Sequence, residues 1–477
     1  MSWLTRVFQI YEVRPKHHDA PPPAVIHEAA MGSSPHPTAK MRKSKFWRGR
    51  CQWSVVTVIA IALVVYNAAA NVWMLRPASC PVLTTQPAPD PPSCEPCVET
   101  ASASAIEDDP IAKLNLRLGR WDKSRSYRMF DYAAVGETYA ESSANNLVCL
   151  ATQTSIERLH ELLKIAAHWT GPISVSVFVA GDELKLLRAF TTWLIRCKHD
   201  VATRLAIHVA TPVEKPANHG KMPVWARDCG SWPLPPLDRR TETVVWRLKN
   251  PYPQNHLRNL ARTSCQTPYV FLVDVDIVPS RDMTESLNKF LKSTPKCRLC
   301  AYVVPTYELD KRVANFPANK TELLRLSKNK LAIPFHRKVF IYNQYASNFS
   351  RWEQSGGNES SDTHISHNVT NFELLYEPFY VAPDTVPAHD ERFLGYGFTR
   401  NSQVYEMFLI GYQFKVLSPI FTIHWGLQGR KSRPLWREKQ NEKNRKNFET
   451  FKRELFARYR RDPLHLLKRP PQIKSKS

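Results

Sequence analysis

The sequence has 477 residues, of which 43% are hydrophobic and 23% charged, a balance typical of globular proteins that excludes collagen, coiled coils and wholesale disorder. Lys and Arg number 66 against 43 Asp and Glu, a formal net charge of +23, with +6 of it in residues 1–50 and +12 in residues 430–477. Because the excess lies at the two ends, the sequence predicts no nucleic-acid partner.

An uncharged apolar run near the N-terminus predicts a membrane anchor. Residues 52–75 contain no charged side chain, and at ~1.5 Å per helical residue they can cross a ~30 Å hydrocarbon core. Basic residues cluster just before the run, whereas Arg76 alone follows it closely. The positive-inside rule therefore predicts a cytosolic tail over 1–51, a type II signal-anchor helix over 52–75 and a lumenal remainder.

A proline-rich stalk is expected over residues 76–112, because proline favours extended polyproline II. The stalk contains Cys80, Cys94 and Cys97. This odd number makes an interchain disulfide, and hence a homodimer, a reasonable expectation.

Features beyond the anchor agree with a lumenal compartment. Glycosylation sequons begin at Asn319, Asn348, Asn358 and Asn368. Six cysteines follow in the folded part, an even number compatible with disulfides whose pairing the sequence leaves open. Zinc binding by the C-x-x-C pairs Cys94/Cys97 and Cys297/Cys300 is less favoured, since a tetrahedral site would have to unite two distant pairs.

Residues 113–429 are expected to form one domain in which strands and helices alternate. Strands are predicted over Leu147–Ala151, Ile173–Val179, Leu205–Val209, Thr243–Arg247, Tyr269–Val273 and Phe421–His424. Helices are predicted over Ile156–His168, Glu183–Cys197, Leu257–Ser264 and Asn401–Ile410. The alternation predicts an α/β domain with a largely parallel, doubly covered sheet, which binds ligands at the carboxyl ends of its strands. Residues 430–477 are expected to be a basic tail, either a solvated helix or a contact for acidic glycans or membranes.

Two aspartates follow the most apolar strand directly. Asp274 and Asp276 alternate, so they project from one face at the strand's carboxyl end. Such paired carboxylates suit Mn²⁺ or Mg²⁺, which can also bridge a nucleotide diphosphate. The alternative is two solvated loop aspartates.

Two further groups of polar residues are candidates for the same site. Asn255, Arg258 and Asn259 share one helix face, which could contact a nucleotide or be an ordinary solvated surface. His424 ends the last strand and could supply a third metal ligand or a structural hydrogen bond.

The motifs together resemble glycosyltransferase family 49. They are, in order, Tyr252–Pro279, Tyr302–Leu309 (YVVPTYEL), Tyr376–Val381 (YEPFYV), Asp390–Phe398 (DERFLGYGF) and Phe421–Gly426 (FTIHWG), and the resemblance covers roughly 145–428. It implies a GT-A type, Rossmann-like fold, a UDP-sugar donor, Mn²⁺ with Mg²⁺ as the alternative, and inversion at the transferred sugar.

The resemblance also implies a function and a location. We expect a Golgi membrane enzyme that transfers glucuronic acid from UDP-glucuronic acid, in β linkage, to a glycan or glycoprotein acceptor such as a xylose-terminated O-glycan. The alternatives are a beta-1,3-N-acetylglucosaminyltransferase using UDP-GlcNAc and a catalytically silent, lumenal glycan-binding scaffold.

The resemblance assigns roles to particular residues. Asp274 and Asp276 become the metal and donor-phosphate site with His424 as third ligand, and Asn255, Arg258 and Asn259 become donor contacts. The general base that inversion requires is expected at Asp390, with Glu391 as second choice. Glu308 and Glu377 rank behind them as candidates for the base and are expected to bind the acceptor. Arg258, Arg392 and Arg400 are candidates for binding the uronate carboxylate.

Overall fold

The computed structural model describes residues 62–66, 109–223, 229–230, 238–355, 362–429 and 434–467. Within these ranges no helix has both the length and the apolar character needed to cross a membrane. The predicted anchor lies outside the described residues except for 62–66, and so do the three stalk cysteines. The chain divides into two compact units, Met1–Cys97 and Val98–Ser477, and the described strands all belong to the second.

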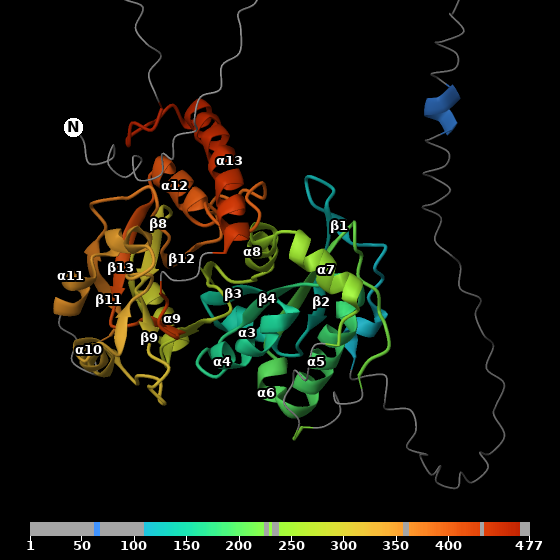
Figure 1. Ribbon diagram of the computed structural model, residues 1–477, viewed down its shortest axis with the longest axis horizontal. Coiled ribbons are helices and arrows are strands. Elements are labelled where there is room, and N and C mark those ends of the chain that lie inside the picture. The colour runs from blue at the N-terminus through green and yellow to red at the C-terminus, as the bar shows by residue number, and fades with distance from the viewer. Residues whose placement is uncertain are drawn as a thin grey trace, which may run out of the picture. The chain divides into compact units, whose positions relative to one another are not determined.

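A ten-stranded sheet forms the centre of this second unit, in the order β1-β2-β5-β4-β3-β6-β12-β8-β13-β11 (Figure 1). The neighbours β5, β4, β3 and β6 run parallel to one another, as the alternation of elements predicts. The bounds of the first six strands are Arg120–Trp121 (β1), Tyr127–Val135 (β2), Leu205–Pro212 (β5), Ile173–Phe178 (β4), Val148–Ser155 (β3) and Tyr269–Leu272 (β6).

Both faces of the parallel strands are covered, and β4 shows why. Its side chains alternate between the two faces: Val175 and Val177 join the main apolar core with helix α5 (Leu184–Cys197). Ser174 and Ser176 point to the other face, where each hydroxyl donates a 2.7 Å hydrogen bond to a backbone carbonyl of helix α8 (Gln254–Thr263). A strand with no exposed residue therefore fits between two helical layers.

The remaining strands are mixed in direction. β12 (Phe379–Pro383) is antiparallel to both β6 and β8 (Cys300–Val304). β13 (Gln413–Ser418) runs parallel to β8, and β11 (His364–Asn368) forms the edge. A smaller sheet has the order β10-β9-β14-β7, with bounds Ala332–Pro334 (β10), Thr306–Leu309 (β9), Thr422–Trp425 (β14) and Ile277–Pro279 (β7).

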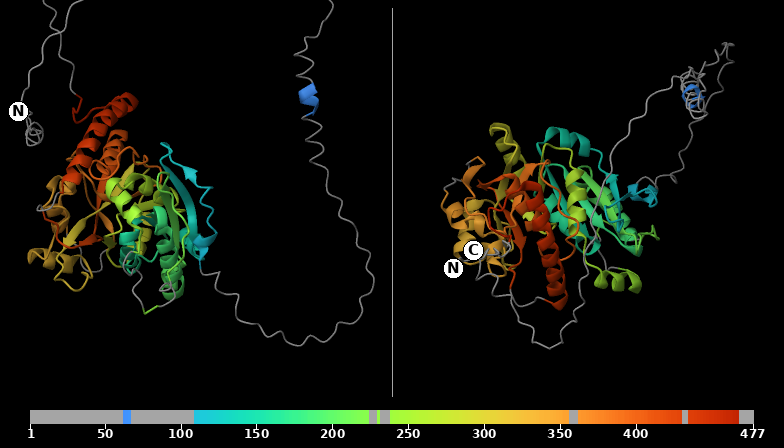
Figure 2. Two further views of the ribbon diagram at one scale, coloured as in Figure 1. Left: turned by 45° about the vertical axis from the view of Figure 1, so that its right-hand side comes forward. Right: turned by 90° about the horizontal axis from the view of Figure 1, so that it is seen from above.

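The other helices surround these sheets, as two further views show (Figure 2). Their bounds are Tyr139–Asn145 (α3), Leu162–Ala166 (α4), His199–Ala202 (α6), Thr241–Lys249 (α7), Met283–Ser293 (α9), Lys320–Lys328 (α10), Phe349–Gln354 (α11), Asn401–Ile410 (α12) and Leu435–Tyr459 (α13).

The structure corrects two sequence-based elements. Residues Thr243–Arg247, predicted as a strand, lie inside helix α7. The helical turn places Thr243 and Arg247 on one side, where they bond to the buried carboxylates of Asp182 and Glu183, and these contacts outweigh the weak strand preference of two valines. The predicted helix over 156–168 is instead a 3-10 helix, Ile156–Glu161, followed by the short α4.

Three disulfides settle the pairing that the sequence left open. They join Cys149 to Cys265, Cys197 to Cys229 and Cys297 to Cys300. The last of these shows that Cys297 and Cys300 form a disulfide in this structure, as opposed to half of a zinc site.

The sequons differ in their surroundings. Asn348 and Asn368 are exposed. Asn319 is half-buried and caps helix α10 with its side chain, which accepts a 2.9 Å hydrogen bond from the Glu322 amide. Asn358 lies outside the described residues.

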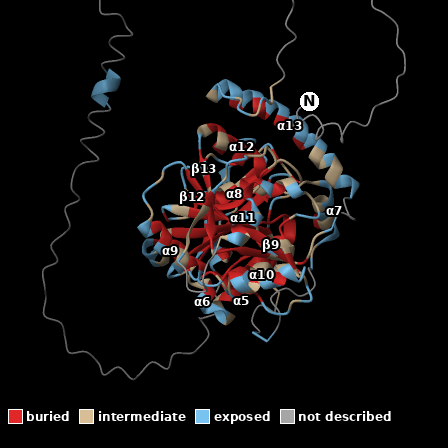
Figure 3. Ribbon diagram, turned by 90° about the vertical axis from the view of Figure 1, so that its left-hand side faces the viewer, coloured by how far each residue is buried: buried red, intermediate tan, exposed pale blue. Residues whose placement is uncertain are grey.

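Helix α13 lies in the segment expected to be a basic tail, and it packs against α12. Its exposed outer side and buried underside are visible in Figure 3. Phe448, Phe451 and Leu455 are buried in a cluster with Phe393 and Tyr405. This strongly basic segment thus also contains a stripe of apolar side chains, and these attach the helix to the domain.

The same helix holds the loop 390–400. The Asn444 side-chain amide donates to the carbonyls of Leu394, Tyr396 and Gly397 at 2.9, 3.0 and 2.9 Å. Gly397 adopts φ +90°, and a side chain there would collide with Asn441 of the helix, so only glycine fits.

Candidate active site

The turn after β6 places the two aspartates where the sequence predicts them. β6 ends at Leu272, Asp274 and Asp276 lie in the following turn, and β7 begins at Ile277. β14 pairs antiparallel with β7 in a register that puts His424 opposite Ile277. Two segments far apart in the sequence thereby bring His424 beside Asp276, with 3.3 Å between Nε2 and Oδ2.

The hydrogen bonds of His424 make it suitable as a metal ligand. Its Nδ1 lies 3.0 Å from the Gly426 carbonyl, which can only accept, so Nδ1 carries a proton and Nε2 is directed at Asp276. Burial lowers the pKa of His424, but the hydrogen bond to Asp276 outweighs this and raises the pKa, so without a metal a second proton on Nε2 is favoured. Two acceptors facing each other need a proton or a cation between them. Their 3.3 Å separation is close to the ~3.0 Å between adjacent ligands of an octahedral ion with ~2.1 Å bonds.

Asp274 has different partners. Its Oδ1 accepts hydrogen bonds from Arg258 at 3.1 Å, Arg400 at 2.9 Å and Gln153 at 3.3 Å. Burial alone would raise the pKa of Asp274, but the two guanidinium groups hold this pKa well below its ordinary value. The expected trio of metal ligands is therefore split: Asp276 and His424 touch, and Asp274 is turned toward the arginines.

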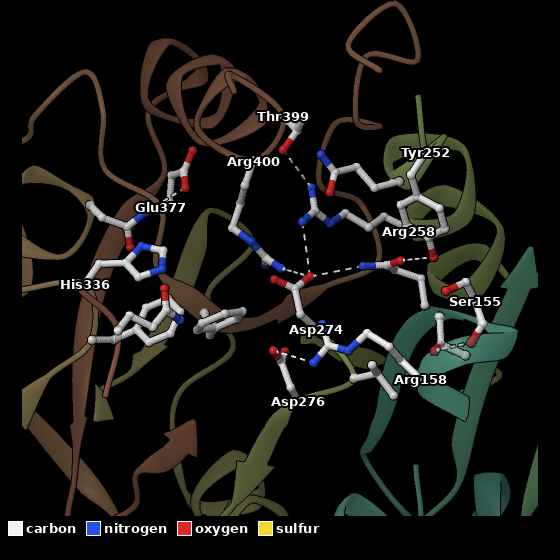
Figure 4. Close-up of a pocket in the computed structure, with 18 residues that line it drawn as sticks. Ser155, Arg158, Tyr252, Arg258, Asp274, Asp276, His336, Glu377, Thr399 and Arg400 are labelled. Atoms are coloured by element: carbon white, nitrogen blue, oxygen red, sulfur yellow. Dashed lines mark hydrogen bonds and ion pairs between the residues drawn. The ribbon is translucent and has the colours of Figure 1, made fainter. Parts of the chain in front are cut away.

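A cavity of about 360 Å³, a size typical of small-molecule sites, is lined by Asp274 and Asp276 (Figure 4). His424 is not among its lining residues and adjoins it through Asp276. Its charged lining residues in the described part of the chain are Arg158, Arg258, Arg400, Asp274, Asp276 and Glu377. Arg158 is half-exposed and forms a 2.7 Å ion pair with Asp276. A divalent cation added to this balanced set would leave a positive excess, which suits an anionic ligand such as a diphosphate.

Of the expected donor contacts only Arg258 reaches the cavity. Asn255 donates a 2.8 Å hydrogen bond to the Asp390 carbonyl, and Asn259 donates to the His389 carbonyl at 2.9 Å and to Glu391 at 3.0 Å. Neither asparagine lines the cavity. The two asparagines do share a polar face of α8, but they bind residues 389–391 of the neighbouring loop.

The two candidate bases also lie outside the cavity lining. The Asp390 carboxylate forms a 2.6 Å ion pair with Arg392, which is also paired with Glu454 of α13. Glu391 faces Asn259 and His256. Arg392 is thus bound to acidic residues outside the cavity. Arg258 and Arg400 line the cavity and remain the candidates for binding a uronate carboxylate.

Glu308 and Glu377 have separate positions. Glu308 is fully buried and accepts hydrogen bonds from the backbone amides of His336 and Gln428 at 2.9 and 3.0 Å, so it fixes the wall of the cavity. Glu377 lines the cavity itself.

A second cluster of potential metal ligands lies elsewhere. One atom each of Asp122, His256 and Glu391 come within 4.8 Å of one another. None of the three lines the cavity. Asp122 already accepts a 2.7 Å hydrogen bond from the Tyr127 amide, so the cluster links the turn after β1 to α8 and the loop at Glu391.

Sequence reasoning missed several lining residues. Arg158 and Gln153 lie at or after the carboxyl end of the parallel strand β3, a position that the rule for ligand sites in such sheets could have indicated. His336 comes from a loop that no motif marks. Burial lowers its pKa to about 4, so His336 is neutral near pH 7.

Comparison with known proteins identifies the class. A family model described as "Glycosyl-transferase for dystroglycan" matches residues 147–460, so the chain belongs to glycosyltransferase family 49 and is a glycosyltransferase. Beta-1,4-glucuronyltransferase 1 of Bos taurus is 33% identical over 361 residues, which cover 73% of this chain and 83% of that one. The human protein of the same name is 32% identical over 358 residues, covering 72% and 82%.

Other similarities are more limited. Xylosyl- and glucuronyltransferase LARGE2 of Mus musculus is 27% identical over 281 residues, covering 58% of this chain and 34% of that one. A crystal structure of GalNAc-T7 with UDP, GalNAc and Mn²⁺ is 8% identical with a TM-score of 0.32, covering 60% of this chain and 45% of that one. The last similarity is too weak to bear on the ligands of this site.

Proposed function

We propose that this chain is an inverting, metal-dependent glycosyltransferase of GT-A type that transfers glucuronic acid from UDP-glucuronic acid to a glycan acceptor, such as a xylose-terminated O-glycan. The observation that carries this proposal is the cavity at the Asp274–Asp276 turn, which is lined by three arginines. His424 contacts Asp276 and can share a cation with it. The names of the relatives favour glucuronic acid as the sugar.

Each charged group then has a task. Asp276 and His424 would hold Mn²⁺, which neutralises charge on the departing UDP. Arg158, released from Asp276, is free to contact a donor phosphate because it is half-exposed at the cavity. Arg258 and Arg400, whose side chains are 4% and 5% exposed, are the candidates to pair with the uronate carboxylate, the group that distinguishes this donor from a neutral sugar.

The location belongs to the same proposal. Residues 52–75 form the signal anchor of a type II Golgi membrane protein, and the catalytic domain is lumenal. The exposed sequons Asn348 and Asn368 support this side of the membrane, because N-glycans are added in the lumen. A mobility shift on removing N-glycans from the expressed chain, absent when Asn319, Asn348, Asn358 and Asn368 are all replaced by glutamine, tests it.

The activity is tested with the full chain in detergent. UDP release is measured from UDP-glucuronic acid, UDP-GlcNAc and UDP-glucose, with Mn²⁺ or EDTA, and with a xyloside acceptor. We expect Mn²⁺-dependent release from UDP-glucuronic acid. Release from UDP-GlcNAc alone would change the donor, and release from none of a full donor panel would favour the glycan-binding scaffold.

A further inference from the structure

Glu377 differs from the other carboxylates of the cavity in having no cationic partner. Of the three carboxylates that line the cavity in the described residues, Asp274 is bound by arginines and Asp276 by Arg158. No lysine or arginine of the described chain forms an ion pair with Glu377. A carboxylate that forms no direct ion pair and lines the cavity is available to accept a proton.

The surroundings of Glu377 hold it in place without neutralising it. The side-chain amide of Asn343, itself 4% exposed, donates a 2.6 Å hydrogen bond to its Oε2. The Glu377 amide in turn donates to the Asn343 carbonyl at 2.8 Å, so the two residues fix each other. The backbone amide of Asn401 also interacts with the carboxylate and lowers its pKa. Asn343 is the one side-chain donor to the Glu377 carboxylate in the described chain, so the carboxylate keeps capacity to accept from a ligand.

The electrostatic setting favours proton uptake. Burial raises the pKa of Glu377 above its ordinary value; Arg400 and Arg258 offset part of this rise, and Asp274 adds to it. A carboxylate with a raised pKa is a stronger general base than an ordinary one, provided it is still ionised near pH 7.

The position of Glu377 suits a displacement with inversion. In Figure 4, Glu377 and His336 lie on one side of Arg400, and Asp274, Asp276 and Arg158 lie on the other. If the UDP phosphates leave from the aspartate side, an acceptor hydroxyl that attacks from the opposite face approaches from the side of Glu377.

We infer that Glu377 is the general base of the transfer reaction, an inference that rests on the proposed function. Glu377 takes the proton from the acceptor hydroxyl as the hydroxyl oxygen forms its bond to the anomeric carbon. The bond from that carbon to the β-phosphate oxygen breaks, and its electron pair leaves with UDP. Asp390, paired with Arg392 outside the cavity, is then a positioning residue of the loop.

The test compares three variants of the full chain: Glu377→Gln, Asp390→Asn and, as a matched control, Glu373→Gln. Glu373 is a nearby acid whose pKa burial also raises, but it does not line the cavity. Transfer from UDP-glucuronic acid and Mn²⁺-dependent binding of UDP are measured separately. We expect Glu377→Gln to lower kcat ~10²- to 10⁴-fold and to leave UDP binding within about twofold.

A second measurement separates a chemical role from a structural one. Azide carries no proton to be removed, so it should restore UDP release in Glu377→Ala and give a glycosyl azide of the product's anomeric form. A Glu377→Gln enzyme within fivefold of wild type, a parallel loss of UDP binding, or no effect of azide would overturn the inference. The proposed function fails separately, if the wild-type chain transfers no sugar.

Discussion

The contact between Asn444 and the loop 390–400 allows a prediction with a magnitude. Replacing Asn444 by Leu keeps the size of the side chain but removes an amide that serves three backbone carbonyls. Asn444 is 1% exposed, so water cannot readily replace it. The two N–H groups of the Asn444 amide make the equivalent of two full hydrogen bonds, each worth ~1–1.5 kcal/mol. The free energy that holds the loop against α13 should therefore fall by ~2–3 kcal/mol in the variant.

The loss should appear at the donor site. The loop leads directly to Arg400, which binds Asp274 at 2.9 Å, so an undocked loop withdraws a cation from the cavity. If the loop is mostly undocked in the variant, the donor must restore the docking when it binds. A loss of ~2–3 kcal/mol in docking free energy then weakens donor affinity by at most ~30- to 150-fold. We expect a rise of at least about tenfold in the Kd of UDP with Mn²⁺.

Titration calorimetry of the full chain, together with a melting curve, checks this expectation. Asn447→Ala is the matched control on the same helix, because it removes one exposed hydrogen bond, to the Arg392 carbonyl at 3.1 Å. If Asn444→Leu melts earlier than wild type but binds UDP equally well, the loop is not coupled to the donor site and the reasoning is refuted.

Two further predictions concern the metal and a disulfide. Asp276→Asn should abolish the Mn²⁺ dependence of UDP binding, because it removes the anionic partner of His424; undiminished stimulation by Mn²⁺ would refute the metal assignment. Replacing Cys149 and Cys265 by serine should lower the free energy of unfolding by ~2–4 kcal/mol, since the bridge closes a loop with a sequence separation of 116; denaturant unfolding measures this, and an unchanged midpoint would contradict it.

The sequence predicts the parts of the fold that depend on local pattern. The apolar run before Asp274 is strand β6, and the β-branched run at 173–179 contains strand β4. The pattern fails at Thr243–Arg247, where buried carboxylates on another element select a helix. Partners so distant in the sequence cannot be predicted from the spacing of residues within a short segment.

The candidate site divides in the same way. The pairing of Asp276 with His424 could be expected from the motif order, and the structure brings the two together. The face formed by Asn255 and Asn259 is also as the helical spacing predicts, but spacing does not reveal what covers a face. Glu377 enters the cavity because Asn343 and the start of β12 hold it there, which depends on the whole fold.

The place of α13 in the chain has a consequence for biosynthesis. Every described residue that lines the cavity precedes Leu435, so the ribosome completes the set of ligand-binding side chains before it makes the helix that fastens one wall. Until α13 emerges, Phe393 lacks its contact with Phe451 and Phe398 its stack on Phe448, and this apolar surface is open to chaperones. A nonsense mutation just before α13 would therefore preserve all the described lining residues and still be expected to yield a misfolded enzyme.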